Sequence, residues 1–256
     1  MDIFAGGLEP WALALAIAVT LVAGFVKGAV GFAMPMIMIS ALSSFLPGHE
    51  ALAALLLPTL TTNLAQAFRQ GPSAAWESVV KYRRMIVTII VFIVISAQFV
   101  LLIPSWLMYV LLGVPIVGFA LYQLSGRPLV IAIHHRKRVE IVLGIVAGLY
   151  GGISGVWGPP LLVYLLSTGT EKREQVRVQG VVFLLGAVML TVAHLRSGVL
   201  NASTAPLSAL LVIPAWIGMW VGFRLQDRLD PVRFRWWTLL LLAITGANLI
   251  RRGLMG

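Results

Sequence analysis

Long apolar runs separated by short polar gaps make up most of the chain. Six of these runs have roughly the 17 to 25 residues that one helical crossing of a bilayer requires. The charged residues gather in the gaps between them. The pattern therefore predicts an all-α polytopic membrane protein. The six runs are residues 51–67, 85–103, 106–124, 176–195, 205–223 and 234–250.

Two further apolar stretches, residues 11–46 and 141–166, contain glycine clusters followed by proline. As a single helix the first would extend roughly 54 Å, which exceeds a bilayer core of about 30 Å but is too short for two full crossings. Glycine and proline also interrupt helices. We therefore interpret each stretch as a broken, re-entrant helical hairpin whose two half-helices meet near the middle of the membrane. With the six runs, this gives about eight hydrophobic segments, the first and the fifth of them broken.

The two glycine clusters match each other at one constant spacing along the chain. The matched residues are Gly24, Gly28, Gly31 and Pro35 in the first cluster and Gly148, Gly152, Gly155 and Pro159 in the second. Four matches within so short a segment indicate that the chain contains two copies of one unit. We predict a first transmembrane repeat at residues 1–124, a basic cytoplasmic linker at 125–138 and a second transmembrane repeat at 139–256.

Loop charge predicts how the segments are oriented. Residues 69–84 and the linker at 125–138 are rich in lysine and arginine, whereas residues 47–50 contain neither. Basic loops remain on the cytoplasmic side of a membrane. We therefore expect residues 69–84 and 125–138 to be cytoplasmic and residues 47–50 to be external. In the second half, residues 224–235 are basic and residues 196–204 carry one arginine. Equivalent loops therefore lie on opposite sides, which predicts an inverted repeat.

Composition narrows the class of protein further. Hydrophobic residues form 59% of the 256 positions and charged residues 11%, against about a quarter charged in a soluble domain, so a water-soluble fold is excluded. The net charge of +10 does not indicate nucleic-acid binding, because the basic residues occupy short membrane loops rather than one face of a soluble domain. The chain has no cysteine, which excludes disulfides and thiolate metal sites. We expect neither a cofactor nor a metal.

The two breaks are the candidate substrate site. Non-helical backbone at membrane depth is tolerated where it lines a cavity or lies in the protein interior, and half-helix N-termini favour anions. The alternative is that these glycines only let helices pack closely. Uncharged polar residues on neighbouring segments could complete the site, among them Thr61, Thr62 and His194. The residues that we expect to bind substrate are Gly24, Lys27, Gly28, Gly31, Phe32, Pro35, Asn63, Gln66, Gly152, Ser154, Gly155, Trp157, Gly158, Pro159 and Gln179.

Lys27 is the only lysine, arginine, aspartate or glutamate well inside an apolar segment. A buried ammonium in a bilayer costs a few kcal/mol, so it needs a partner. We expect backbone carbonyls or an anionic substrate to fill that role. The alternative is that Lys27 extends to a nearby interface from a shallow hairpin tip.

An enzymatic interpretation rests on the sequence Gly152-Ile153-Ser154-Gly155. It resembles the Gly-x-Ser-Gly of intramembrane serine proteases, and His194 lies on a later segment where a general base could stand. Ser154 corresponds to Val30 in the other repeat, while the flanking glycines recur there. The repeat thus explains the glycines without catalysis, and we expect that the protein is not an enzyme.

The paired glycine-rich openings resemble those of the sulfite exporter TauE/SafE family, also called the toluene sulfonate uptake permeases. The resemblance covers essentially the whole chain, and its specific part is Gly24-x3-Gly28-x2-Gly31-x3-Pro35 with its counterpart from Gly148 to Pro160. It implies a bacterial inner-membrane transporter for small sulfur-containing or carboxylate anions, such as sulfite or organosulfonates. Met34, which stands where the second copy has Gly158, and Lys27 depart from the pattern and leave the substrate open.

We predict that the protein is a secondary transporter that works by alternating access at a site near the membrane midplane. Export is the expected direction of transport. An anion channel and an intramembrane serine protease remain the alternatives. The partners expected are a small anionic substrate and the lipid bilayer, with a homodimer as a further possibility and no nucleic acid.

Overall fold

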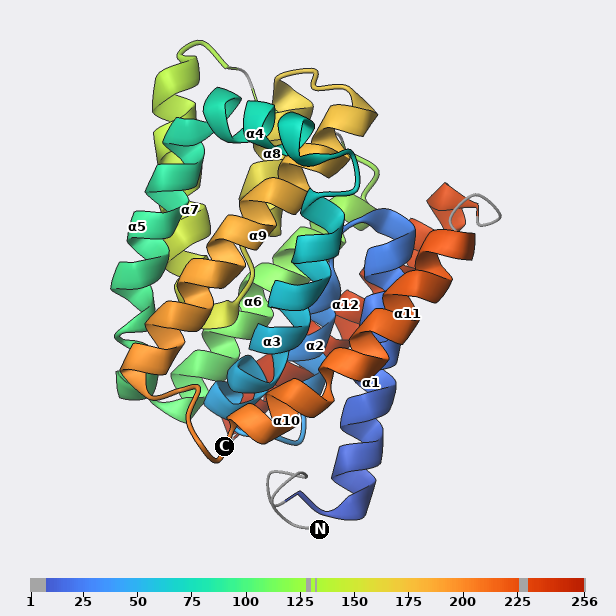
Figure 1. Ribbon diagram of the computed structural model, residues 1–256. Helices are drawn as coiled ribbons and strands as arrows, with labels where there is room; N and C mark the ends of the chain where they lie inside the picture. Colours follow the sequence, from blue (N-terminus) through green and yellow to red (C-terminus); the bar gives the residue numbers. More distant parts are fainter. Residues whose placement is uncertain (1–7, 128–129, 132, 226–229, 256) are drawn as a thin grey trace.

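The computed structural model describes residues 8–127, 130–131, 133–225 and 230–255, and over this part of the chain the protein is all-α (Figure 1). The helices follow the apolar runs, and most of them have a proline at or next to their first residue or a glycine directly after their last. Their bounds are α1 Pro10–Val30, α2 Met34–Leu42, α3 Gly48–Ala67, α4 Pro72–Lys81, α5 Arg83–Ala97, η1 Val100–Leu102, α6 Ser105–Leu124, α7 Arg136–Ser154, α8 Gly158–Ser167, α9 Lys172–Ser197, α10 Ala205–Leu210, α11 Val212–Leu225 and α12 Pro231–Met255.

The helices confirm a polytopic membrane protein. Six spans in the described residues are long and apolar enough to cross a bilayer, and a seventh is possible if α3 and α4 count as one span bent by 104°. The apolar helix α8 is shorter than a full crossing. The six spans are Pro10–Ala29, Arg83–Leu102, Ser105–Leu124, Glu174–Ser197, Ala205–Leu225 and Val232–Met255.

Both glycine-rich stretches are broken where the sequence predicts. The first is interrupted between α1 and α2, and the second between α7 and α8. Gly31 and Gly155 end the leading helices with φ angles of 85° and 72°, which favour glycine. Their N–H groups donate to the carbonyls of Lys27 at 2.7 Å and of Gly151 at 2.8 Å. The arms are unequal, because the 21 residues of α1 suffice for a whole crossing whereas α2 has nine.

The main helix contacts join the two halves of the chain. The sequence repeat makes α1 equivalent to α7 and α11 equivalent to α5. Accordingly, α1 packs along α11 and α7 packs along α5, while α3 contacts α9 and α6 contacts α12. Exchanging the two repeats turns the α1–α11 contact into the α7–α5 contact, and it leaves the α3–α9 and α6–α12 contacts unchanged. A pseudo-two-fold axis between the repeats has this effect. The exact repeat boundaries at residues 1–124 and 139–256 stay a prediction.

Two segments differ from their expected structure. The basic segment at residues 69–84 is interpreted as a loop from its polarity, but Pro72–Lys81 forms α4. This helix turns sharply from α3, buries Ala75 and Ser78, and exposes Trp76, as an amphipathic helix at a membrane surface does. The helix α7 begins at Arg136, so the last residues of the predicted linker are already helical.

The ends of the helices separate into two groups (Figure 1). The start of α1 and the end of α12 lie at one end of the bundle, and α4 lies at the opposite end. An inverted repeat in which each copy begins with a helical hairpin requires this placement of the two ends of the chain opposite α4. The assignment of the α4 end to the cytoplasm rests on loop charge and stays a prediction.

Candidate functional site between the two helix breaks

A small buried pocket lies where the two breaks meet. Residues from both breaks form its walls, together with side chains from α3 and α9. Its volume of about 30 Å³ leaves room for on the order of one or two water molecules. The lining residues are Phe32, Ala33, Pro35 and Met36 from the first break, Gly155, Val156, Trp157 and Gly158 from the second, Thr59 and Asn63 from α3, and Phe183 from α9.

Lys27 is buried next to this pocket, with 2% of its surface exposed. Its ammonium donates to the Thr62 hydroxyl at 2.8 Å and to the Asn63 side-chain oxygen. The Thr62 hydroxyl in turn donates to the carbonyl of Pro58 at 2.6 Å. The protein partners are therefore side chains of α3 rather than backbone carbonyls, and Lys27 does not extend to an interface. An anionic substrate as a further partner stays a prediction.

Asn63 stands between Lys27 and the pocket. Its oxygen accepts from Lys27, and its Nδ2 donates to the carbonyl of Phe183 at 3.0 Å. Both Asn63 and Phe183 line the pocket, whereas Lys27 does not. No carboxylate in the described part of the chain forms an ion pair with Lys27. The positive charge is thus solvated by neutral oxygens only, and its field favours an anion in the adjoining pocket.

Three buried polar atoms around the pocket have no hydrogen-bond partner among the residues that the structure describes. They are the Thr59 hydroxyl, the indole nitrogen of Trp157 and the side-chain oxygen of Gln66. Thr59 and Trp157 line the pocket. Buried polar groups are nearly always paired, so unpaired ones mark a place where a polar ligand can bind. Two of the three, a hydroxyl and an indole N–H, can donate to an anion.

Four of the glycines have a packing role. A methyl group added to Gly24 or Gly28 would overlap the backbone of α11, and one added to Gly148 or Gly152 would overlap the backbone of α5. For Gly148 the nearest backbone atom is the Ile89 carbonyl oxygen, at 2.7 Å from the added carbon. These residues allow close helix contact, which is the alternative considered for them above.

The structure divides the expected site residues into three groups. Six line the pocket: Phe32, Pro35, Asn63, Gly155, Trp157 and Gly158. Three others, Gly31, Gln66 and Gln179, lie together outside the pocket wall. The Gly31 carbonyl accepts a hydrogen bond from Gln66 at 2.9 Å, and a methyl group on Gly31 would lie 3.9 Å from the Gln179 oxygen. The remaining residues do not line the pocket: Gly24, Lys27, Gly28, Gly152, Ser154 and Pro159.

Five wall residues are absent from the expected set: Ala33 and Val156 within the two breaks, Met36 on α2, and Thr59 and Phe183 on α3 and α9. Thr59 precedes Asn63 by one helical turn, and Phe183 follows Gln179 by one turn. Helix periodicity places each of them on the same face as a residue already suspected. That spacing is the signal that could have found them.

In the described part of the chain, Ser154 and His194 make hydrogen bonds to other groups and not to each other. The Ser154 hydroxyl donates to the carbonyl of Tyr150 at 2.7 Å and accepts from the Val156 N–H at 3.1 Å. His194 is fully buried, and its ring nitrogens contact the Gly152 carbonyl at 2.9 Å and the Ser197 hydroxyl at 3.2 Å. Both side chains therefore satisfy local backbone groups around the second break.

Comparison with known proteins gives one match. A family model described as sulfite exporter TauE/SafE matches residues 16–249, which is nearly the whole chain. No curated protein and no solved structure matches it.

Proposed function

Because this chain belongs to the sulfite exporter TauE/SafE family, we propose that it is a secondary transporter that exports small sulfur-containing anions, such as sulfite or organosulfonates, across the bacterial inner membrane. The observation that carries the proposal is the pocket between the two breaks, with the buried cation Lys27 behind its Asn63 wall. Among the residues that the structure describes, no carboxylate pairs with Lys27.

Anion recognition follows from the groups around this pocket. Thr59 and Trp157 have hydrogen-bonding atoms without partners, and an oxyanion can accept from both. Lys27 holds the oxygen of Asn63, which keeps the amide fixed in the wall. A preorganised group of donors with a nearby cation binds an anion without a large reorganisation cost.

The size and the place of the pocket support alternating access as the mechanism. At about 30 Å³ it is too small for an organosulfonate, so substrate can enter only after the breaks move apart. The walls come from both halves, and the long contacts α1–α11 and α7–α5 also cross between the halves. A rocking motion about these contacts would open the pocket to one end of the bundle at a time.

Flux measured with purified protein in proteoliposomes tests this function. Trans-acceleration of labelled sulfite by unlabelled sulfite, together with transport against a sulfite gradient driven by an imposed ion gradient, supports a secondary transporter. Flux that only dissipates the gradient and shows no counterflow indicates a channel. The Ser154→Ala variant should keep its transport activity, and survival of function in this variant excludes the protease alternative.

Membrane orientation is tested by cysteine labelling of intact cells. We expect an impermeant thiol reagent to react with Ser203→Cys on the external side and not with Ser125→Cys on the cytoplasmic side. The native chain has no cysteine, so each variant carries a single label site. Reaction at Ser125→Cys but not at Ser203→Cys would overturn the orientation, and with it the interpretation of the basic loops.

A further inference from the structure

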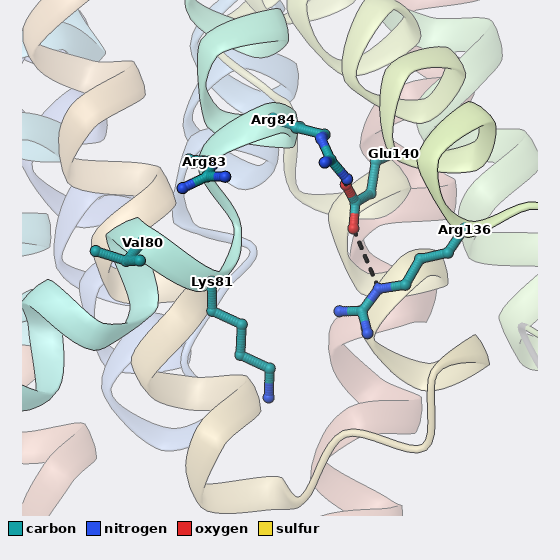
Figure 2. Close-up of a pocket in the computed structure, with 6 residues that line it drawn as sticks. All are labelled: Val80, Lys81, Arg83, Arg84, Arg136 and Glu140. Carbon is teal, nitrogen blue, oxygen red and sulfur yellow. Dashed lines mark hydrogen bonds and ion pairs between the residues drawn. The ribbon is translucent and has the colours of Figure 1, made fainter.

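A second, larger cavity lies at the α4 end of the bundle and shares no residue with the central pocket. It has a volume of about 390 Å³, within the range of about 300 to 1,000 Å³ that small-molecule sites occupy. It opens where the end of α4 meets the starts of α5 and α7 (Figure 2). Its lining residues are Val80, Lys81, Arg83, Arg84, Arg136 and Glu140.

The cavity carries an excess of positive charge, because four of its six lining residues are cations and one is an anion. Lys81 pairs with Glu174 at 2.6 Å, and this hydrogen bond raises the pKa of Lys81, so it stays charged. Arg83 has no hydrogen bond or ion pair to any residue that the structure describes. The helices α5 and α7 begin at Arg83 and Arg136, so their positive dipole ends add to the charge of these side chains.

Glu140 is the only acidic residue of the cavity, and it is almost fully buried, with 4% of its surface exposed. It accepts hydrogen bonds from the Tyr164 hydroxyl at 2.6 Å and from Arg136 Nε at 3.2 Å, and Arg84 lies 4.0 Å away. Figure 2 shows the side chains of Arg84 and Arg136 reaching Glu140 from different helices. Within the described ranges the terminal nitrogens of Arg136 have no hydrogen-bond partner, so they can bind an incoming ligand.

Orientation in the membrane does not explain this geometry. The rule that basic residues stay in the cytoplasm depends on how many there are in a loop and does not require their side chains to converge. Here, arginines from α5 and α7 meet over one buried carboxylate that also holds Tyr164 of α8. The arrangement is that of an anion site whose cations are held by an internal carboxylate.

We propose that this cavity captures a small soluble oxyanion at the cytoplasmic end of the protein, with Arg83, Arg84 and Arg136 as its ligands and Glu140 as an internal competitor for the same arginines. The inference rests on the proposed function in one respect, namely that the captured oxyanion is the anion that the protein transports. Tyr164 connects the two sites, because it lies on α8, whose first residue Gly158 lines the central pocket. An anion that draws the arginines away from Glu140 therefore weakens the contacts that hold α8.

Binding of sulfite to purified protein in detergent, measured by calorimetry at low ionic strength, tests the proposal. Arg83→Gln/Arg84→Gln should weaken binding to the cavity roughly tenfold, as expected for lost charge-assisted contacts on half-exposed groups. Glu140→Gln should strengthen it by roughly tenfold, because a repelling charge is removed while the amide oxygen still accepts from Tyr164. Added salt should weaken wild-type binding, and it should weaken binding to the double variant less.

The matched control is Arg127→Gln/Arg138→Gln, which removes the same charge from exposed residues outside the cavity. It should bind sulfite within about twofold of the wild type. The proposal is wrong if both double variants weaken binding equally. It is also wrong if Glu140→Gln, shown by thermal unfolding to be folded, binds no more tightly than the wild type.

Two further arms separate this proposal from its neighbours. In a Lys27→Met background the central site is weakened, so sulfite binding that still responds to Arg83→Gln/Arg84→Gln supports the cavity whether or not the protein transports sulfite. The competing interpretation is that an anionic lipid headgroup binds the same arginines, and nanodiscs test it. If phosphatidylglycerol, compared with phosphatidylcholine, abolishes sulfite binding and stabilises the wild type but not Arg83→Gln/Arg84→Gln, the cavity is a lipid site and the proposal is overturned.

Discussion

The two helix breaks share a backbone and differ in chemistry. Gly31 and Gly155 both end a helix in the left-handed region and both cap it with their own N–H group. The capped carbonyl belongs to Lys27 in the first break and to Gly151 in the second. In the first break, an ammonium is held by Thr62 and Asn63. In the second, the equivalent glycine has no side chain to offer.

A bulky ring occupies the space that a second lysine would need. A methyl group on Gly151 would already lie 3.0 Å from the Trp157 ring, which is tighter than ordinary van der Waals contact. Trp157 in turn is equivalent to Ala33, which has a φ of 76° and is the only non-glycine residue with positive φ in the described part of the chain. The repeat thus keeps the helix geometry twice but places the cation in one half and the large aromatic donor in the other.

The largest expected effect concerns what the halves share. A methyl group on Gly28 would overlap the Met219 carbonyl, and one on Gly152 would lie 2.6 Å from the Ile93 carbonyl. Because rigid backbone must then shift in a close helix contact, we expect Gly28→Ala and Gly152→Ala each to lose about 3 kcal/mol or more of stability. Thermal unfolding of the purified variants measures this loss.

Gly118→Ala is the control for these two variants. Gly118 lies within α6, and nothing lies within 4 Å of an added methyl group. Alanine there should be neutral or stabilising by up to about 1 kcal/mol, because it has the higher helix propensity. If only one of Gly28→Ala and Gly152→Ala is destabilising, the two contacts are not equivalent and the pseudo-two-fold arrangement fails.

The next effect concerns what the halves do not share. Lys27→Met should weaken binding of the anionic substrate roughly 30-fold, because a charge one side chain away from the anion contributes about 2 kcal/mol at an effective dielectric of about 20. Stability should change little, since removing a buried ammonium offsets the hydrogen bonds lost at Thr62 and Asn63. Lys27→Arg should recover only part of the affinity, because a planar fork replaces a compact charge.

Substrate affinity and thermal stability measured on the same two preparations decide the role of Lys27. Unchanged affinity in Lys27→Met would end the case for its charge in binding. A large fall in stability with unchanged affinity would make Lys27 a packing residue of α1 and α3 instead.

These differences also show what the sequence can and cannot reveal. The breaks at Gly31 and Gly155 and the spans around them were predictable, because glycine, proline and long apolar runs act locally. The helix α4 was missed, since the charges of Glu77 and Lys81 make Pro72–Lys81 look like a loop until its neighbours bury one face. The burial of Glu140 depends on Tyr164 of α8, a contact that only tertiary packing creates.

A smaller effect is expected from the aromatic donor of the second half. Trp157→Phe removes the unpartnered indole N–H from the pocket wall while keeping an aromatic ring. The loss of one neutral hydrogen bond to the bound anion should weaken binding about 2- to 12-fold. Titration of sulfite against both proteins measures it. Equal affinity would mean that Trp157 shapes the pocket but does not donate to the substrate.

The last comparison is between the two glycines that end the leading helices, where the difference expected between the variants is about 1 kcal/mol. Alanine at either position must adopt a positive φ, which costs roughly 1 kcal/mol. At Gly31 nothing lies closer than 3.8 Å to the added methyl group, whereas at Gly155 the group would lie 2.8 Å from Leu55 Cδ1. Gly31→Ala should therefore lose about 1 kcal/mol of stability and Gly155→Ala about 2 kcal/mol, since the flexible Leu55 side chain can yield only in part. Thermal unfolding of the two variants side by side measures the difference. Equal losses would mean that backbone strain alone sets the cost and that the first and second breaks are packed alike after all.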